Sequence, residues 1–267
     1  MRFMKKWLTC AATFATLHLT ALYQSNPSLP EIIDKGFFLP GDLFVGIRAG
    51  YQHDQVFDRN LNARGNIKGE VSKVSQEYDQ GVLTLNFMDR VELFGSAGAM
   101  SIFVTDRQKV NAIHYHANYQ SKHQFTWGAG IRAALINWKD TVFGASANFQ
   151  YANPDMRWAT VEGSTVFNTG GIRIAEWQVG VAVSQHIDIF NPYIGVNYSK
   201  VHSSVHGIGI KKTHFIPSYP SKFEMRSRHH FGMVLGCDLS TEKYFDLGIE
   251  AQLISEQAFT VKGDIRF

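Results

Sequence analysis

Cysteine is scarce in this chain, and no long apolar run follows its first 25 residues. The 267 residues contain two cysteines, Cys10 and Cys237. Cys10 lies in an amino-terminal segment that we expect to be cleaved, so the exported chain keeps one thiol and forms no internal disulfide. A helix that crosses a bilayer needs about 20 apolar residues, and residues 26–267 contain no such run. We therefore expect no membrane-spanning helix.

Net charge is also low once the amino-terminal segment is set aside. Residues 1–25 combine Arg2, Lys5 and Lys6 with the uncharged apolar run Trp7 to Leu22, which is the pattern of a secretory signal peptide. The run is short for a membrane anchor. Cleavage removes three basic groups and no acidic one, so the formal charge falls from +3 to about 0. The charge therefore indicates no nucleic-acid partner.

An exported chain without a spanning helix is either a secreted soluble protein or a barrel. The last ten residues, AFTVKGDIRF, favour the barrel because they alternate strictly. One side of the predicted strand carries Phe259, Val261, Ile265 and Phe267, and the other carries Thr260, Lys262, Asp264 and Arg266. A terminal aromatic residue such as Phe267 is typical of the closing strand of an outer-membrane barrel.

The same alternation recurs along the chain. It is found in residues 43–52, 83–87, 125–135, 143–151, 176–184, 231–239 and 245–253. The longer apolar faces suit the roughly 9–11 residues of a tilted membrane strand, while the opposite faces carry glycine and charge. Aromatic residues gather at strand ends, as interfacial girdles do. The alternative is a soluble two-sheet protein with an aromatic core. We predict an all-β fold, a transmembrane antiparallel up-and-down β-barrel.

The connections predict the strand count and orientation. Short turns are expected near residues 89–90, 139–140, 188–191 and 241–243, and a tight turn near 256–257. Long polar stretches occupy residues 58–71, 105–122, 153–171 and 203–227. Because bacterial barrels have short periplasmic turns and long outer loops, this pattern fits ten strands. Twelve strands result if residues 64–76 or 108–119 pair separately. Residues 26–41 are expected to be a periplasmic lead-in, and residues 42–267 the barrel.

Several segments resemble one known family, the major outer membrane porins of the chlamydiae. They are VFDR at Val56–Arg59, LTLNFMDRVELFGSAGA at Leu83–Ala99, WGAGIRAALINW at Trp127–Trp138, GASANFQYA at Gly144–Ala152, EWQVGVAVS at Glu176–Ser184, NPYIGVNYSK at Asn191–Lys200, and the terminal VKGDIRF. They occur in family order across nearly the whole chain. The resemblance implies a surface-exposed porin, often a homotrimer, that passes small hydrophilic solutes through the outer membrane. Family members are typically longer and rich in cysteine, whereas this chain is short and cysteine-poor.

Charged side chains on the predicted interior are the candidate functional residues. By the phase of the alternation they are Arg48, Arg132, Glu176, Asp246, Glu250, Lys262, Asp264 and Arg266. In an open channel, rings of opposite charge select solutes by charge and size. The alternative is that they pair with one another and fill the interior, because about ten strands enclose only a narrow lumen. The residues themselves leave both readings open.

Other chemistries find little support in the sequence. His114 and His116 share a strand face and could chelate a metal ion, but neither has a cysteine or carboxylate beside it in a ligand pattern. We therefore expect no metal site and no cofactor. His202 and Ser203 are adjacent, so they face opposite sides of a strand, and no G-x-S-x-G motif or phosphate loop is present. We expect no catalytic residue.

Two functions compete at this point. The first is a porin in contact with outer-membrane lipid, which carries small hydrophilic solutes. The second is a closed structural or adhesive barrel that acts through its outer loops. In either case the resemblance implies that Phe267 is a signal recognised by the barrel-assembly machinery.

Overall fold

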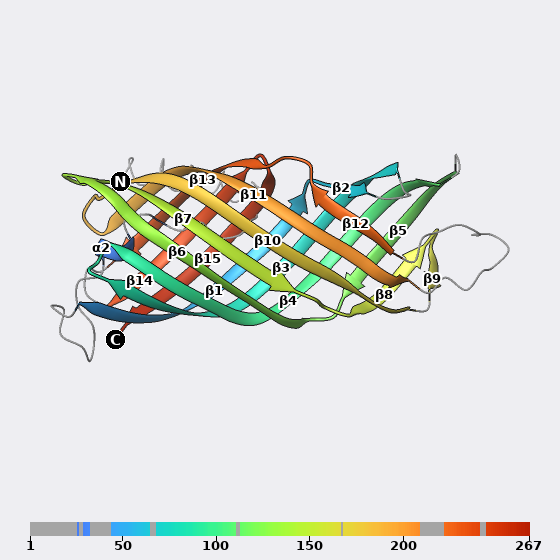
Figure 1. Ribbon diagram of the computed structural model, residues 1–267, viewed down its shortest axis with the longest axis horizontal. Coiled ribbons are helices and arrows are strands. Elements are labelled where there is room, and N and C mark those ends of the chain that lie inside the picture. Colours follow the sequence, from blue (N-terminus) through green and yellow to red (C-terminus); the bar gives the residue numbers. More distant parts are fainter. Residues whose placement is uncertain are drawn as a thin grey trace, which may run out of the picture.

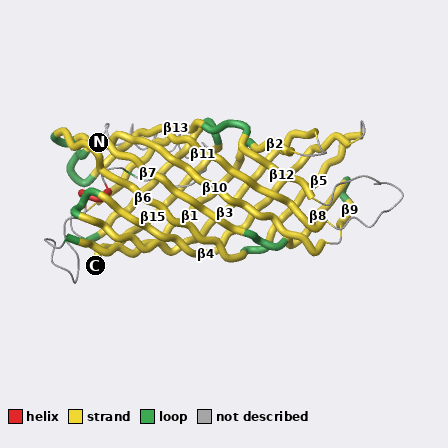
Figure 2. Tube along the Cα trace, in the orientation of Figure 1, coloured by secondary structure: helices red, strands yellow, loops and turns green. Residues whose placement is uncertain are grey.

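The computed structural model describes residues 26, 29–32, 44–64, 68–110, 113–166, 168–208, 222–240 and 244–267. Within this part of the chain, long antiparallel strands wrap into an elongated cylinder (Figure 1). Figure 2 shows that strands form almost all of the described trace and that loops are confined to short pieces. The expected signal peptide, residues 1–25, lies outside the described residues.

Ten of the described strands close on themselves. In chain order they are β1 (Val45–Arg59), β3 (Lys68–Phe87), β4 (Val91–Val110), β6 (Gln124–Trp138), β7 (Thr141–Ala152), β10 (Asn168–Gln185), β11 (Phe190–Ile208), β13 (Phe231–Ser240), β14 (Phe245–Leu253) and β15 (Glu256–Arg266). Each pairs antiparallel with its chain neighbour among the ten, and β15 pairs with β1 to close the ring. The predicted up-and-down barrel is confirmed, with ten strands in the ring.

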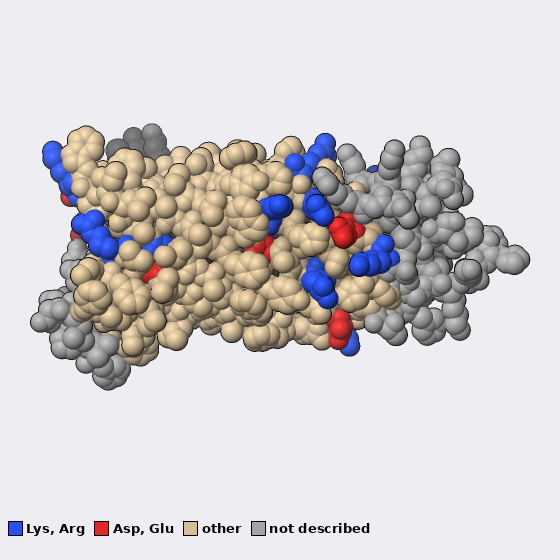
Figure 3. All heavy atoms as spheres, in the orientation of Figure 1, with Lys and Arg blue, Asp and Glu red and all other residues tan. Residues whose placement is uncertain are grey.

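The alternation sorts side chains between the two faces of the wall. Trp127, Phe149 and Leu247 are 42%, 37% and 50% exposed on the outside, whereas the inward side chain of Arg48 is 1% exposed. A soluble two-layer protein would bury the first three, so that alternative is wrong. Figure 3 shows the result on one face, where uncharged atoms cover most of the length between the left end and the middle. Lysine, arginine and carboxylate side chains gather at the left end and toward the right.

Short turns and the carboxyl terminus share one end of the barrel, which we call the near end. The β3–β4 turn holds Met88 and Asp89 at positive φ, and the β6–β7 turn holds Lys139 in the same way. The β10–β11 connection has Asp188 at φ 58°. These turns lie where the sequence predicts them; the one expected at residues 241–243 falls outside the described residues. The β14–β15 turn lies at mid-height of the barrel and centres on Ile254 and Ser255, two residues before the predicted position.

The described parts of the predicted long polar stretches are largely strand, and this corrects the expectation of loops there. Strands β1, β3, β4, β10 and β11 run on past the other five. Short strands continue the wall there: β2 (Leu61–Arg64), β5 (Ile113–Ser121), β8 (Met156–Val161), β9 (Ser164–Val166) and β12 (Lys222–Ser227). They pair in the order β11–β12–β2–β3–β4–β5–β8–β9 and all lie toward the right of Figure 1.

Beyond the middle of the barrel the two faces exchange character. Inward positions there are apolar, as Met100, Ile102 and Val104 on β4 illustrate with exposures of 0–1%. They belong to one buried cluster that reaches β1, β3, β5, β8, β10, β11 and β12 and includes Tyr119 and Phe223. Apolar-in and polar-out is the arrangement of a barrel in water. Sequence reading missed it because only the apolar-out pattern was sought.

A short helix lies at the near end. Helix α2 (Leu29–Ile32) belongs to the expected lead-in, and Leu29 is completely buried. The Arg48 guanidinium donates to the carbonyl oxygen of Leu29 at 3.2 Å, and Asn86 Nδ2 donates to the carbonyl oxygen of Pro30 at 2.8 Å. This part of the chain therefore enters the mouth of the barrel. None of the described helices is long and apolar enough to cross a membrane.

Candidate functional site: the barrel interior

A first charged group lies near the near end, where β13, β14 and β15 face inward. The register pairs Asp246 with Asp264 and Gly248 with Lys262. Lys262 Nζ consequently lies 3.1 Å from Asp246 Oδ2 and 3.0 Å from Asp264 Oδ2. A Cβ at Gly248 would come 2.8 Å from Lys262 Cε and 2.1 Å from an Asp238 oxygen. Glycine on the inner face therefore makes room for these long side chains.

A second group joins β1, β4 and β6. Glu92 and Arg132 are direct cross-strand partners, and Arg132 Nη1 lies 3.2 Å from Glu92 Oε2. Arg48 reaches across from β1 and donates to the other carboxylate oxygen of Glu92. The guanidinium of Arg132 also stacks over the ring of Phe94, 4.8 Å from its centroid. Glu92 is thus held between two guanidinium groups.

A third group closes the charged section at mid-height. Arg59 donates from Nη1 and Nη2 to the two carboxylate oxygens of Glu176 at 2.7 and 3.1 Å. The same guanidinium also pairs with Glu256. All three side chains are at most 2% exposed. We call Arg59, Glu176 and Glu256 the mid-barrel triad; the near section lies between it and the near end, and the far section lies beyond it.

Two further predicted residues complete the charged interior. Glu250 accepts hydrogen bonds from the Tyr193 hydroxyl at 2.7 Å and from Gln252 Nε2 at 3.1 Å. Arg266 lies 3.2 Å from Asp89 in the β3–β4 turn. After Arg266 the chain ends at Phe267, whose backbone N–H donates to the carbonyl oxygen of Ile47 at 2.9 Å. The last residue is therefore still part of the wall.

The structure places every predicted interior charge inside the barrel. The exposed fractions of Arg48, Arg132, Glu176, Asp246, Glu250, Lys262, Asp264 and Arg266 range from 0% to 8%. Sequence reading missed three of their partners. Glu92 alternates with the outward residues Val91 and Leu93 on β4, so the period of two could have identified it as an inward charge. Arg59 follows a register shift between Val56 and Asp58, and Glu256 was assigned to a turn. That the eight residues line a conducting pore stays a prediction.

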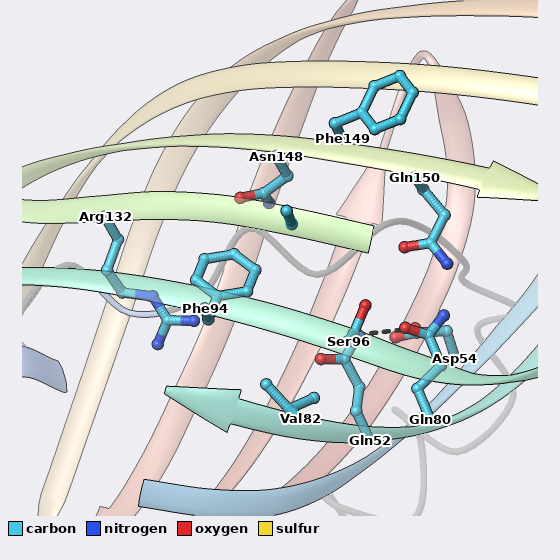
Figure 4. A pocket seen from close by; sticks show the side chains of 11 residues that line it. Gln52, Asp54, Gln80, Val82, Phe94, Ser96, Arg132, Asn148, Phe149 and Gln150 are labelled. Carbon is cyan, nitrogen blue, oxygen red and sulfur yellow. Dashed lines mark hydrogen bonds between the residues drawn. The ribbon is translucent and has the colours of Figure 1, made fainter. Parts of the chain in front are cut away.

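Between these groups lies a small polar cavity of about 30 Å³. Figure 4 shows Asn148 and Gln150 on one side of β7 and Phe149 on the other. Asp54, which also lines the cavity, accepts hydrogen bonds from Gln52 at 2.7 Å and from Thr260 at 2.6 Å. The volume holds about two water molecules but no hydrated solute. In this conformation, passage through the cavity requires interior side chains to move.

A closed barrel with an apolar outside, a charged inside and its short turns at one end is an outer-membrane β-barrel protein. The family model for the Chlamydia major outer membrane protein matches residues 156–218. The major outer membrane porin of Chlamydia abortus strain DSM 27085 / S26/3 is 24% identical over 389 residues, covering 100% of both chains. That of Chlamydia pneumoniae is 23% identical over 391 residues, covering 99% of this chain and 100% of its own.

The chain is thus similar over its whole length to the chlamydial major outer membrane porins, and its place is the outer membrane. The predicted resemblance and location are confirmed. The alignments, at 389 and 391 residues, are longer than this chain of 267, so the relatives contain segments that it lacks.

Comparison with solved structures finds outer-membrane proteins at low TM-scores. The protein OprG from Pseudomonas aeruginosa is 8% identical with a TM-score of 0.39, covering 88% of this chain and 99% of its own. An outer membrane channel from Pseudomonas putida F1 is 9% identical with a TM-score of 0.42, and the match covers 86% of this chain and 99% of the channel. The outer membrane protease OmpT from Escherichia coli is 10% identical with a TM-score of 0.39, and the match covers 83% of this chain and 92% of the protease. Likeness at this level carries no information on function.

Proposed function

We propose that this protein is an outer-membrane porin through which small hydrophilic solutes diffuse passively. The observation that carries the proposal is the charged interior of the near section, which contrasts with its apolar outside. Side chains of both signs inside a membrane cylinder interact favourably with water and with polar solutes. The relatives that match the whole chain are named porins, which supports the same function.

The proposal assigns roles to individual residues. Positive charge along the path comes from Arg48, Arg132, Lys262 and Arg266, and negative charge comes from Glu176, Asp246, Glu250 and Asp264. The polar cavity among the interior side chains is only about 30 Å³ in this conformation. Solutes therefore pass when the ion pairs of the interior open. We assign the protein no catalytic residue and no cofactor. Its other partners are outer-membrane lipid, two further copies in a homotrimer, and the barrel-assembly machinery.

A second function is favoured by the far section. There the inside of the barrel is packed with apolar side chains such as Ile102, Tyr119 and Phe223, each at most 3% exposed. A packed apolar interior excludes water and hydrophilic solutes. If this packing persists in the membrane, the protein is a closed structural or adhesive barrel that acts through its outer surface.

Conductance in planar lipid bilayers distinguishes the two functions. Refolded protein that acts as a porin produces stepwise currents in potassium chloride, whereas a closed barrel remains silent at every voltage. The protein is checked for folding first by its heat-modifiable mobility in a denaturing gel. Silence of folded protein contradicts the porin.

Replacement of an interior charge tests whether the current follows the proposed path. Lys262→Gln removes a cation that is 4% exposed and lies between two carboxylates, so the interior becomes more negative. The reversal potential in a salt gradient shifts toward cation selectivity. The matched control is Lys200→Gln, because Lys200 on β11 is exposed on the outside. Equal reversal potentials in both variants contradict a path through the charged interior.

A further inference from the structure

A cluster of potential metal ligands lies on the outside of the barrel, apart from the charged interior. His53 on β1 and Asp79 on β3 are direct cross-strand partners, and Glu77 is two residues from Asp79 on the same face of β3. One ligand atom from each of His53, Glu77 and Asp79 lies within 4.8 Å of the other two. Such convergence from two adjacent strands is what a chelating site requires.

The three side chains are partly exposed, and neighbouring groups hold the Asp79 carboxylate in place. The side chains of His53 and Asp79 are 35% and 41% exposed, and their Nδ1 and Oδ1 atoms lie 2.8 Å apart. The Tyr51 hydroxyl donates to the same oxygen of Asp79. The candidate ligand atoms beyond these contacts are the second carboxylate oxygen of Asp79, the carboxylate of Glu77 and the second ring nitrogen of His53. Carboxylates that bind metal are commonly held by such a neighbouring donor.

Electrostatics also favours a cation here. Glu77 and Asp79 carry like charges on one face of one strand, and a bound cation would offset their repulsion. Imidazole nitrogen suits zinc and other first-row transition ions, whereas sites for magnesium and calcium are built from oxygen alone. One nitrogen and two carboxylates therefore favour an ion such as Zn²⁺, with the remaining coordination position open to water or another ligand.

We propose that His53, Glu77 and Asp79 form a binding site for a first-row divalent metal ion of the Zn²⁺ type on the outward face of β1 and β3. The site is independent of whether the barrel conducts. Sequence reading predicted no metal site because it examined ligand spacing within single segments. The ligands of this site come from strands that are paired only in the folded barrel.

Calorimetric titration of Zn²⁺ into the folded, chelator-treated protein in detergent tests the proposal. Glu77→Gln keeps the shape of the side chain but removes its charge, and His53→Ala removes the nitrogen ligand. Each change is expected to weaken binding at this site at least tenfold. Two variants are used so that failure of one to fold leaves the test intact, and folding is checked by heat-modifiable mobility.

Matched controls account for the other histidines and carboxylates of the chain. His202→Ala and Glu224→Gln change an exposed and a half-exposed residue outside the cluster and should leave Zn²⁺ binding unchanged. With Co²⁺ in place of Zn²⁺, the visible absorption of the bound ion should be lost in Glu77→Gln and His53→Ala only. Zn²⁺ isotherms that are the same in wild type and in both cluster variants overturn the site. Equal competition by Ca²⁺ overturns the assignment to a transition metal.

Discussion

At the scale of single residues, the interior combines charges that are costly to bury with partners that offset the cost. Arg59 shows this most clearly, since its guanidinium faces two carboxylates and none of the three side chains reaches bulk water. A buried ion pair contributes little by itself, but removal of one member leaves an uncompensated charge. Residues of the triad are therefore individually sensitive.

Arg59→Met tests this sensitivity. The variant leaves Glu176 and Glu256 buried without their shared cation, so the free energy of unfolding should fall by about 3–5 kcal/mol. Urea unfolding in lipid vesicles, followed by tryptophan fluorescence, measures the change. Arg173→Met is the matched control, because Arg173 is exposed on β10 near Glu176. Equal unfolding midpoints for the two variants would show that Arg59 contributes no more to stability than an exposed arginine does.

The terminal residue provides a second test at this scale. Phe267 is half-buried and continues the pairing of the wall through its bond to Ile47, although β15 ends at Arg266. Deletion of Phe267 should lower the yield of assembled protein in the outer membrane, measured by fractionation and heat-modifiable mobility. Phe267→Tyr keeps an aromatic end and is expected to assemble normally. Full yield without residue 267 would refute an assembly role.

Single residues also show how far alternation carries a prediction. All eight interior charges were found from a period of two, because that period is local. Arg59 was not found, because the register shift between Val56 and Asp58 changes the phase of β1. The metal-site residues His53 and Asp79 were not found as a pair, since their contact depends on the register of β1 against β3.

At the scale of elements, the segment before β1 is more than a lead-in. Its helix α2 is held inside the near end by Arg48 and Asn86, and Asn26 Nδ2 donates to the carbonyl oxygen of Asn191 at 3.1 Å. Three interior or rim positions thus bind one short segment. That arrangement narrows the near-end mouth of a barrel whose interior is already occupied by ion pairs.

Removal of residues 27–41 should therefore enlarge the path. If the barrel conducts, the single-channel current of this deletion should rise about twofold or more over that of the full mature chain. Planar-bilayer recording measures the change. The control replaces residues 33–41 with a serine-glycine linker of equal length, which keeps α2 in place. An unchanged current in the deletion would show that α2 does not restrict the path.

At the scale of the whole molecule, the near and far sections of the barrel wall place their apolar side chains on opposite faces. In the near section, apolar side chains face outward and charge faces inward, because a charged group on the lipid side costs about 2–4 kcal/mol at the bilayer midplane. In the far section the apolar side chains point inward and form the cluster around Met100 and Tyr119, which is the arrangement expected of a wall surrounded by water. The mid-barrel triad lies where the two arrangements meet. This inversion gives the porin and the closed barrel each a structural argument.

The sequence by itself predicted the ten strands of the ring and, in the near section, the faces of their side chains, because alternation and turn residues act over only a few positions. The tertiary structure decided which charges pair, as with Arg59 and Glu176, which are 117 positions apart in the chain. It also decided that the outer stretches extend the barrel and that His53 meets Glu77 and Asp79. These features depend on register between strands and on closure of the ring, and neither is encoded within a single segment.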